Sequence, residues 1–398
     1  MAKIVEMLRP VRPERQEKEG LLAQIGQQRD YYDYNLLACV ILLTCFGLVM
    51  LYSTSAYEAS VNYNNDMFFF GKQALISALS VVGMIIGSQI DYHMYIGYSG
   101  VLYVFSMLLL VVTRFIGNEV NGARRWLRFG PLSFQTAELA KLAVILFLSW
   151  LISQGNGVMK GWKEPLRIGF FGFIAAFFTF FFTKNLSTAV IIAGISFFLL
   201  FLVHKDTRPV IAIMGAGVIM VVLFILIAVP RITTQTSDFR LRRIMVWIDP
   251  EAYPDQGGYQ VMQGLYAIGS GGFFGKGLGN SAQKLGAVPE AQNDMIFSII
   301  CEELGVFGAI MVVLLFAFLL YRLLFVARNA PDLLGALIAS GIFIHISLQV
   351  LLNIAVVINL IPTTGITLPF VSYGGSSIMF LMAEMMTALS ISKQISLK

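Results

Sequence analysis

Long apolar runs follow one another along almost the whole chain, separated by short polar segments. About 20 apolar residues form a helix long enough to cross a lipid bilayer. The run at residues 295–327 exceeds one perpendicular crossing, so we expect its first part to be tilted or to rise from the membrane surface. The pattern predicts ten membrane-spanning helices, at about residues 35–53, 73–90, 95–113, 136–153, 167–183, 188–203, 209–229, 295–327, 333–360 and 377–392.

Polar segments complete the predicted layout. Residues 1–34 are polar and charged, and we expect them to form a tail outside the membrane. Residues 35–396 then form one ten-span domain, with a large outer loop at about 230–294 between the seventh and eighth helices. The predicted fold class is therefore an all-α polytopic membrane protein.

Positive charges predict the orientation of this bundle. The tail carries six Lys and Arg residues, and segments rich in these residues stay on the cytoplasmic side. An even number of crossings then places both termini in the cytoplasm. The outer loop 114–135 breaks the rule, because it holds Arg114, Arg124, Arg125 and Arg128. Ion pairs within the loop would explain these arginines, and so would an anion site, since guanidinium groups match phosphate oxygens.

The composition agrees with a membrane protein and excludes some other classes. Apolar residues make up 57% of the chain and charged residues only 13%, whereas soluble domains have about 25% charged residues. The net charge of +5 is spread over loops, so it does not indicate a nucleic-acid surface. The three cysteines lie in or beside apolar runs, which favours small buried residues over disulfides or metal ligands.

Charged and polar side chains within the predicted spans are candidates for function. Glu138 and Lys141 are three residues apart, so they share a helix face and can pair. The pair could order the bundle, or it could line a polar cavity where Lys141 meets a phosphate. His345, Gln349 and Asn353 repeat every four residues, which favours contacts between helices over a metal site. Glu384 has no basic partner nearby in the sequence.

The outer loops carry the densest candidate chemistry. A glycine-rich stretch around Lys276 does not match a Walker phosphate loop, because Gly277 follows the lysine where Ser or Thr is required. Asp294 lies where the large loop meets the eighth span, so it could be a general base with a raised pKa or a helix cap. The uncharged segment 362–377 offers hydroxyl groups that could bind an oxyanion or a sugar, although turn formation explains it almost as well.

These motifs, taken in order, resemble the FtsW/RodA/SpoVE (SEDS) family across all ten predicted spans. The features Trp247–Glu251 and Pro289–Ala291 resemble the FtsW/SpoVE branch more than RodA. The matching stretches are Asn121–Leu127, Phe134–Gln135, Glu138–Lys141, Gly258–Gln260, Gly271–Gly279, Pro289–Phe297, Glu302–Gly305 and Leu368–Ser377.

The resemblance implies a peptidoglycan glycosyltransferase at the outer face of the bacterial cytoplasmic membrane. Such an enzyme polymerises lipid II onto glycan linked to undecaprenyl pyrophosphate, for septal or lateral wall synthesis. It implies Asp294 as the catalytic residue. It also implies a class B penicillin-binding protein as partner, within divisome or elongasome assemblies and without nucleic acid. The residues expected to bind substrate or pyrophosphate are Arg124, Arg125, Glu138, Lys141, Lys276, Ser372, Ser376 and Ser377.

Two departures and two rival functions qualify this expectation. The chain has Gln135-Thr136-Ala137-Glu138 where the family often has Gln-Pro-Ser-Glu, which leaves the glutamate in place. It has Lys184-Asn185-Leu186-Ser187 where the family often has Pro-Asp-Leu-Gly, so no catalytic carboxylate is expected there. We expect no resident metal site, although Mg²⁺ or Mn²⁺ held partly by substrate could share the leaving charge. A lipid II flippase or a non-catalytic scaffold for a transpeptidase remain the alternatives.

Overall fold

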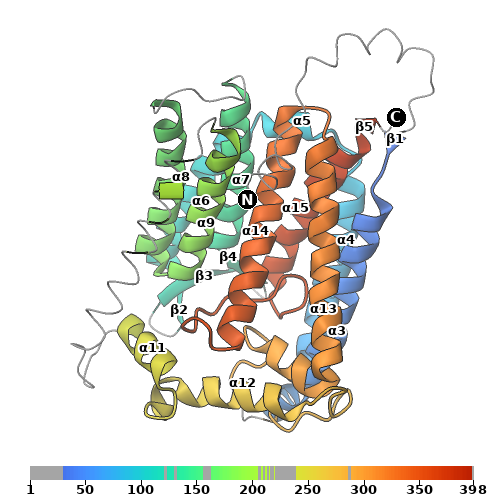
Figure 1. Cartoon of the computed structure of the whole chain (residues 1–398), viewed down its shortest axis with the longest axis vertical. Coiled ribbons are helices and arrows are strands. Elements are labelled where there is room, and N and C mark those ends of the chain that lie inside the picture. Colours follow the sequence, from blue (N-terminus) through green and yellow to red (C-terminus); the bar gives the residue numbers. More distant parts are fainter. Residues whose placement is uncertain are drawn as a thin grey trace.

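The computed structural model describes residues 30–120, 123–129, 132–155, 163–204, 239–285 and 288–396, with a few positions between 208 and 219. Within these residues, nine helices are long and apolar enough to cross a membrane, and they pack side by side as one bundle (Figure 1). The all-α membrane fold is therefore confirmed. The predicted span at 209–229 and most of the predicted tail at 1–34 lie outside the described residues.

The long helices follow the predicted apolar runs closely. The central helix, α7, is mostly buried, because it packs against α6, α8, α9, α14 and α15, whereas α4 exposes most of its side chains. A short helix, α5 (Tyr92–Ile96), precedes α6. The long helices are α3 (Tyr34–Tyr63), α4 (Phe68–Gly87), α6 (Ser99–Ile116), α7 (Thr136–Ser153), α8 (Lys163–Thr183), α9 (Leu186–Val203), α13 (Ile296–Asn329), α14 (Leu333–Val357) and α15 (Gly375–Lys393).

The arginine-rich segment 114–135 was expected to be an outer loop. It instead begins with the end of α6 and continues as a small antiparallel sheet. Its strands are β2 (Asn118–Val120), β3 (Ala123–Phe129) and β4 (Leu132–Gln135), with β3 in the middle. Ala123 and Leu127 lie on one face of β3 and are buried, with Arg125 between them on the same face. β4 runs directly into α7, so the sheet is fixed to the central helix.

The predicted outer loop at about 230–294 also contains regular structure. It includes α11 (Phe239–Ile248), the 3₁₀ turn η3 (Pro254–Gln256) and α12 (Gly258–Ser270). In Figure 1, α11 and α12 lie across one end of the bundle, close to the three-stranded sheet. We call this end of the bundle the site end.

The over-long eighth predicted span is one element, α13, that breaks at Gly305. The backbone of Gly305 has φ 68° and ψ −167°, which only glycine adopts easily. A Cβ there would approach the backbone nitrogen of Gly275 to 2.4 Å. The glycine-rich stretch packs into this break, and Lys276 and Gly277 donate backbone hydrogen bonds of 2.9 Å to the carbonyls of Glu302 and Glu303. The stretch therefore completes the hydrogen bonding of a broken helix.

The two ends of the described chain meet at the end of the bundle opposite the site end. β1 (Asp30–Tyr31) pairs with β5 (Ile395–Ser396) as a two-stranded sheet (Figure 1). Next to it, Arg322 of α13 donates to the buried carboxylate of Asp33 over 2.8 Å. This contact ties the start of α3 to the far end of α13.

Candidate active site

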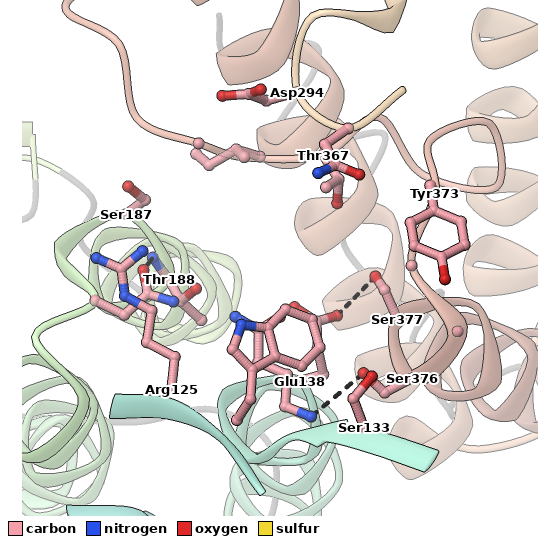
Figure 2. Close-up of a pocket in the computed structure, with 18 of the residues that line it drawn as sticks. Arg125, Ser133, Glu138, Ser187, Thr188, Asp294, Thr367, Tyr373, Ser376 and Ser377 are labelled. Carbon is pink, nitrogen blue, oxygen red and sulfur yellow. Dashed lines mark hydrogen bonds between the residues drawn. The ribbon is translucent and has the colours of Figure 1, made fainter. Parts of the chain in front are cut away.

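A cavity of about 560 Å³ opens at the site end of the bundle (Figure 2). Its walls come from the three strands β2, β3 and β4, from the helices α4, α7, α9, α11, α12, α14 and α15, and from the segments before α9, α13 and α15. Elements far apart in the sequence therefore converge on one space. Five basic side chains line it against three acidic ones, so the cavity suits an anionic ligand.

Asp294 lies in the segment just before α13 and lines this cavity. The helix cap is Met295, with no side-chain capping bond, so Asp294 does not act as the cap. Burial raises the pKa of Asp294 to about 6, with a further rise from the charge of Glu290 and an opposing effect from Arg243. A carboxylate with this pKa is ionised at neutral pH and still basic enough to accept a proton in a reaction.

Asn353 of α14 fixes the backbone around Asp294. Its side-chain amide donates to the carbonyl of Asp294 over 2.9 Å and to that of Ile366 over 2.7 Å. The backbone N–H of Tyr373 also donates to the carbonyl of Gln292 over 2.9 Å. These bonds join the segment that carries Asp294 to the segment 362–377. Asn353 was expected to contact a neighbouring helix, but its bonds instead hold two non-helical segments of the site together.

Glu138 of α7 lies across the cavity from Asp294 in Figure 2, and Lys141 of the same helix also lines the cavity. Their predicted pairing is confirmed, with 3.0 Å between the Lys141 Nζ and the Glu138 Oε1. The Ser377 hydroxyl donates to the other oxygen of Glu138 over 3.0 Å, and the Ser376 hydroxyl accepts the backbone N–H of Gln135 over 3.3 Å. The pair is thus both a buried ion pair and part of the cavity wall.

Three arginines reach the cavity. Arg125 and Arg128 come from β3, and Arg243 comes from α11. Arg243 donates to the carbonyl of Thr363 over 3.0 Å, and burial lowers its pKa, helped by the neighbouring charge of Arg125 and opposed by Asp294. An arginine remains charged despite such a shift. Bidentate guanidinium groups around one space are well suited to phosphate oxygens.

Three of the residues predicted to bind substrate lie elsewhere. Arg124 donates to the carbonyls of Arg114 and Phe115, Lys276 pairs with Glu302 at 2.6 Å, and the Ser372 hydroxyl accepts the backbone N–H of Leu368 over 2.8 Å. None of the three lines the cavity. Arg124 instead turns toward the end of α6 and toward Glu119 of β2, whose carboxylate lies 3.6 Å from its Nε, whereas Arg125 and Arg128 of the same strand reach the cavity.

Several residues that line the cavity were not assigned to it from the sequence. Arg243 and Lys72 were not singled out, Glu290 was named only within a matching motif, and Gln349 was expected to contact other helices. A signal for Arg243 was present, because the outer loop 230–294 holds a basic group at residues 240–243 that conflicts with the positive-inside rule, as 114–135 does. Lys72 gave no such signal, and the spacing of Gln349 marked only a polar helix face, because the packing of α4 and α14 is what brings both residues to the site.

The fold and this site define a polytopic membrane protein with a charged cavity at one end of its helix bundle. The family described as cell cycle protein, FtsW/RodA/SpoVE, matches residues 33–397. The chain therefore belongs to the FtsW/RodA/SpoVE family, as its motifs predicted.

Individual relatives and solved structures agree with this family. The chain is 36% identical to stage V sporulation protein E of Bacillus subtilis, over 91% of this chain and 97% of that one. It is 34% identical to the probable peptidoglycan glycosyltransferase FtsW of Geobacter sp. strain M18, over 91% and 96%.

Solved structures show the same architecture. A chain from a peptidoglycan synthase complex, studied for its coordination of polymerization and crosslinking, superposes with a TM-score of 0.75 at 26% identity, over 92% of this chain and 99% of that one. RodA of Thermus thermophilus superposes with a TM-score of 0.66 at 24% identity, over 92% and 98%. The FtsW and SpoVE relatives are thus more similar to this chain in sequence than this RodA is. This confirms the predicted resemblance to the FtsW/SpoVE branch.

Proposed function

We infer that this protein is a peptidoglycan glycosyltransferase of the FtsW/SpoVE type that polymerises lipid II. The observation that carries the proposal is Asp294, a partly buried carboxylate with a raised pKa that lines a basic cavity. Relatives over more than nine-tenths of the chain bear the name of this activity. A carboxylate base beside phosphate-binding cations is the set of groups that transfer of a sugar from a pyrophosphate requires.

The proposed reaction joins two lipid-linked substrates. Asp294 removes the proton from the sugar 4-hydroxyl of one lipid II. At the same time, the oxygen of that hydroxyl bonds to the anomeric carbon of the glycan on undecaprenyl pyrophosphate. The bond from that carbon to the pyrophosphate oxygen breaks, and the pyrophosphate leaves with the electron pair. Arg125, Arg243 and Lys141 stabilise this leaving charge with groups already in place. Both lipid tails stay in the bilayer beside the bundle.

A divalent cation fits this scheme only if the protein and the substrate both supply ligands to it. Among the described residues, no group of three or more His, Cys, Asp or Glu side chains is placed to hold a metal. Glu290 and Asp294 both line the cavity, so Mg²⁺ or Mn²⁺ would take further ligands from pyrophosphate oxygens and water. Such an ion would offset the charge of the leaving group.

The proposed orientation places the cavity at the outer face of the cytoplasmic membrane and both termini in the cytoplasm. Support comes from the β1–β5 pair, which lies at the end of the bundle opposite the site end. The basic tail adjoining β1 favours the cytoplasmic side. Lipid II would then be used on the side where the wall is built.

We further propose that the enzyme works with a class B penicillin-binding protein in division or elongation complexes. The superposed chain with a TM-score of 0.75 belongs to a synthase complex that couples polymerization and crosslinking. A crosslinking partner would act on the glycan strands as they leave the cavity.

Gel analysis of glycan strands made from purified lipid II tests the proposal. Wild type, Asp294→Ala and Asp294→Asn would be assayed alone and with a co-purified transpeptidase. Asp255→Asn is the matched control, because Asp255 lies in the same outer region but is exposed and outside the cavity. We expect strands from wild type and the control, and a loss of about 10²–10⁴-fold in both Asp294 variants.

Two results would overturn the proposal. Absence of strands from wild type, even with the partner, would exclude a polymerase and make a lipid-flipping assay the next step. Normal strands from Asp294→Ala would leave the polymerase but remove Asp294 as its base.

A further inference from the structure

A chain of buried polar side chains leads from the cavity wall into the middle of the bundle. It connects Lys141 of α7, Gln349 and His345 of α14, and Glu384 of α15. The Lys141 Nζ donates to the Gln349 Oε1 over 2.9 Å, the His345 Nε2 lies 2.9 Å from the same oxygen, and the His345 Nδ1 lies 2.8 Å from the Glu384 Oε2. Each of the four side chains is at most 2% exposed. Glu384, which lacked a partner in the sequence, thus has one from another helix.

The hydrogen bonds determine where the protons are. The Gln349 side-chain oxygen only accepts, so the His345 Nε2 must carry a hydrogen. The Gln349 amide nitrogen donates to the carbonyl of Thr367 over 3.0 Å, which fixes the orientation of the amide. One proton is then shared between the His345 Nδ1 and Glu384, in either an ionised or a neutral pair. In both cases the Nε2–H points at Gln349.

This arrangement limits the freedom of the Lys141 ammonium group. Of its three donors, one goes to Glu138 and one to Gln349 within the described part of the chain. Because Lys141 lines the cavity, its third donor is available to a ligand there. A lysine side chain has several rotatable bonds, so two fixed partners reduce the number of positions that its charge can occupy.

We propose that His345 and Glu384 are positioning residues for the glycosyl transfer reaction. By locking the amide of Gln349, they hold the Lys141 ammonium group where the pyrophosphate charge develops. The inference rests on the proposed polymerase function and adds a role for two side chains that do not touch substrate. The competing explanation is a purely structural link between α14 and α15.

Two substitutions of Glu384 separate these explanations. In Glu384→Gln, the new amide donates to the Nδ1 of a neutral His345, so the Nε2–H still points at Gln349 and most of the activity is retained. In Glu384→Leu, the Nδ1 has no partner and the imidazole can present an unprotonated Nε2 to Gln349. We expect kcat to fall about 10-fold or more with little change in KM, because misaligned groups at a reaction centre cost up to about 10²-fold.

A third variant guards against misfolding. The double variant His345→Phe with Glu384→Leu replaces both members of the pair by apolar side chains. Proteins often tolerate such a replacement of a buried polar pair without loss of stability. It leaves Gln349 without its histidine donor, so kcat should fall as in Glu384→Leu. Ser340→Ala is the control, because it removes a buried hydrogen bond of α14, from the Ser340 hydroxyl to the carbonyl of Ala336, away from this chain of residues.

The measurements are kcat and KM for lipid II and the melting temperature of each purified variant. Low kcat in Glu384→Leu and the double variant, with activity retained in Glu384→Gln, supports the inference. Equal losses in the Gln and Leu variants, or losses that only follow the melting temperature, would overturn it. A wild type that makes no glycan would instead refute the polymerase itself, and the inference with it.

Discussion

The rate of glycan polymerisation should fall steeply on the acid side of neutrality, because the proposed base Asp294 titrates there. Its pKa of about 6 leaves about 90% of the carboxylate ionised at pH 7 and about 10% at pH 5. The base form is present above this pKa and is lost as the pH falls through it. We therefore expect kcat/KM to fall about tenfold between pH 7 and pH 5. An ordinary aspartate would remain about 90% ionised at pH 5.

We call the fall in rate below neutral pH the acid limb of the pH profile. The charges next to Asp294 predict two opposite shifts of this limb. Glu290→Gln removes a negative charge that raises the pKa of Asp294, so the limb should move to lower pH. Arg243→Gln removes a positive charge that lowers the same pKa, so the limb should move to higher pH. The assay is the initial rate of lipid II consumption between pH 5 and pH 8 at constant ionic strength. Constant salt matters because it screens the charges compared.

The control is a melting curve at each pH, which separates loss of the base from loss of the fold. A profile that stays flat down to pH 5 in folded wild type would refute the reasoning. So would shifts in the same direction for the Glu290 and Arg243 variants, because charges of opposite sign must act oppositely on one carboxylate.

Three further substitutions have definite expected outcomes. Asp294→Asn should melt at a higher temperature than wild type, and the difference should be larger at pH 8 than at pH 5. The reason is that a raised pKa means the ionised carboxylate destabilises the folded state, increasingly so as the pH rises. A difference in melting temperature that does not change with pH would contradict this. Gly305→Ala should lower the melting temperature through a backbone cost of about 1–3 kcal/mol plus steric overlap, whereas Gly269→Ala, where a Cβ meets nothing within 4 Å, should not. Arg125→Gln should reduce kcat/KM about 10-fold or more, since a charged hydrogen bond contributes about 1.5–3 kcal/mol. Arg124→Gln should reduce it less than about twofold. A loss for Arg125→Gln as small as that for Arg124→Gln would contradict a role of Arg125 in the site.

The membrane helices could be predicted from the sequence because the signal is the length of an apolar run, a property of consecutive residues. The pairing of Glu138 with Lys141 was predictable for the same reason, since helical spacing places them on one face. The same spacing identified the polar face of His345 and Gln349. It gave no information on which neighbouring helix lies against that face.

The remaining features depend on contacts between distant segments. Glu384 finds His345 only through the packing of α14 on α15. The three-stranded sheet was missed because its strands are short and one of them is rich in arginine, so the alternation of buried Ala123 and Leu127 with charged residues gives a weak strand signal. The position of Asp294 allowed a cap or a base, and only the geometry at Met295 decided against the cap.

The break at Gly305 also determines where the lipid begins along α13. An unbroken helix over Ile296–Asn329 would extend about 51 Å, far beyond a hydrocarbon core about 30 Å thick. The part after Gly305 extends about 36 Å, which a modest tilt accommodates. The part before it can stay out of the hydrocarbon, where Glu302 and Glu303 keep their hydrogen bonds to Lys276 and Lys284. One glycine thus resolves a hydrophobic mismatch and spares two carboxylates the cost of entering lipid.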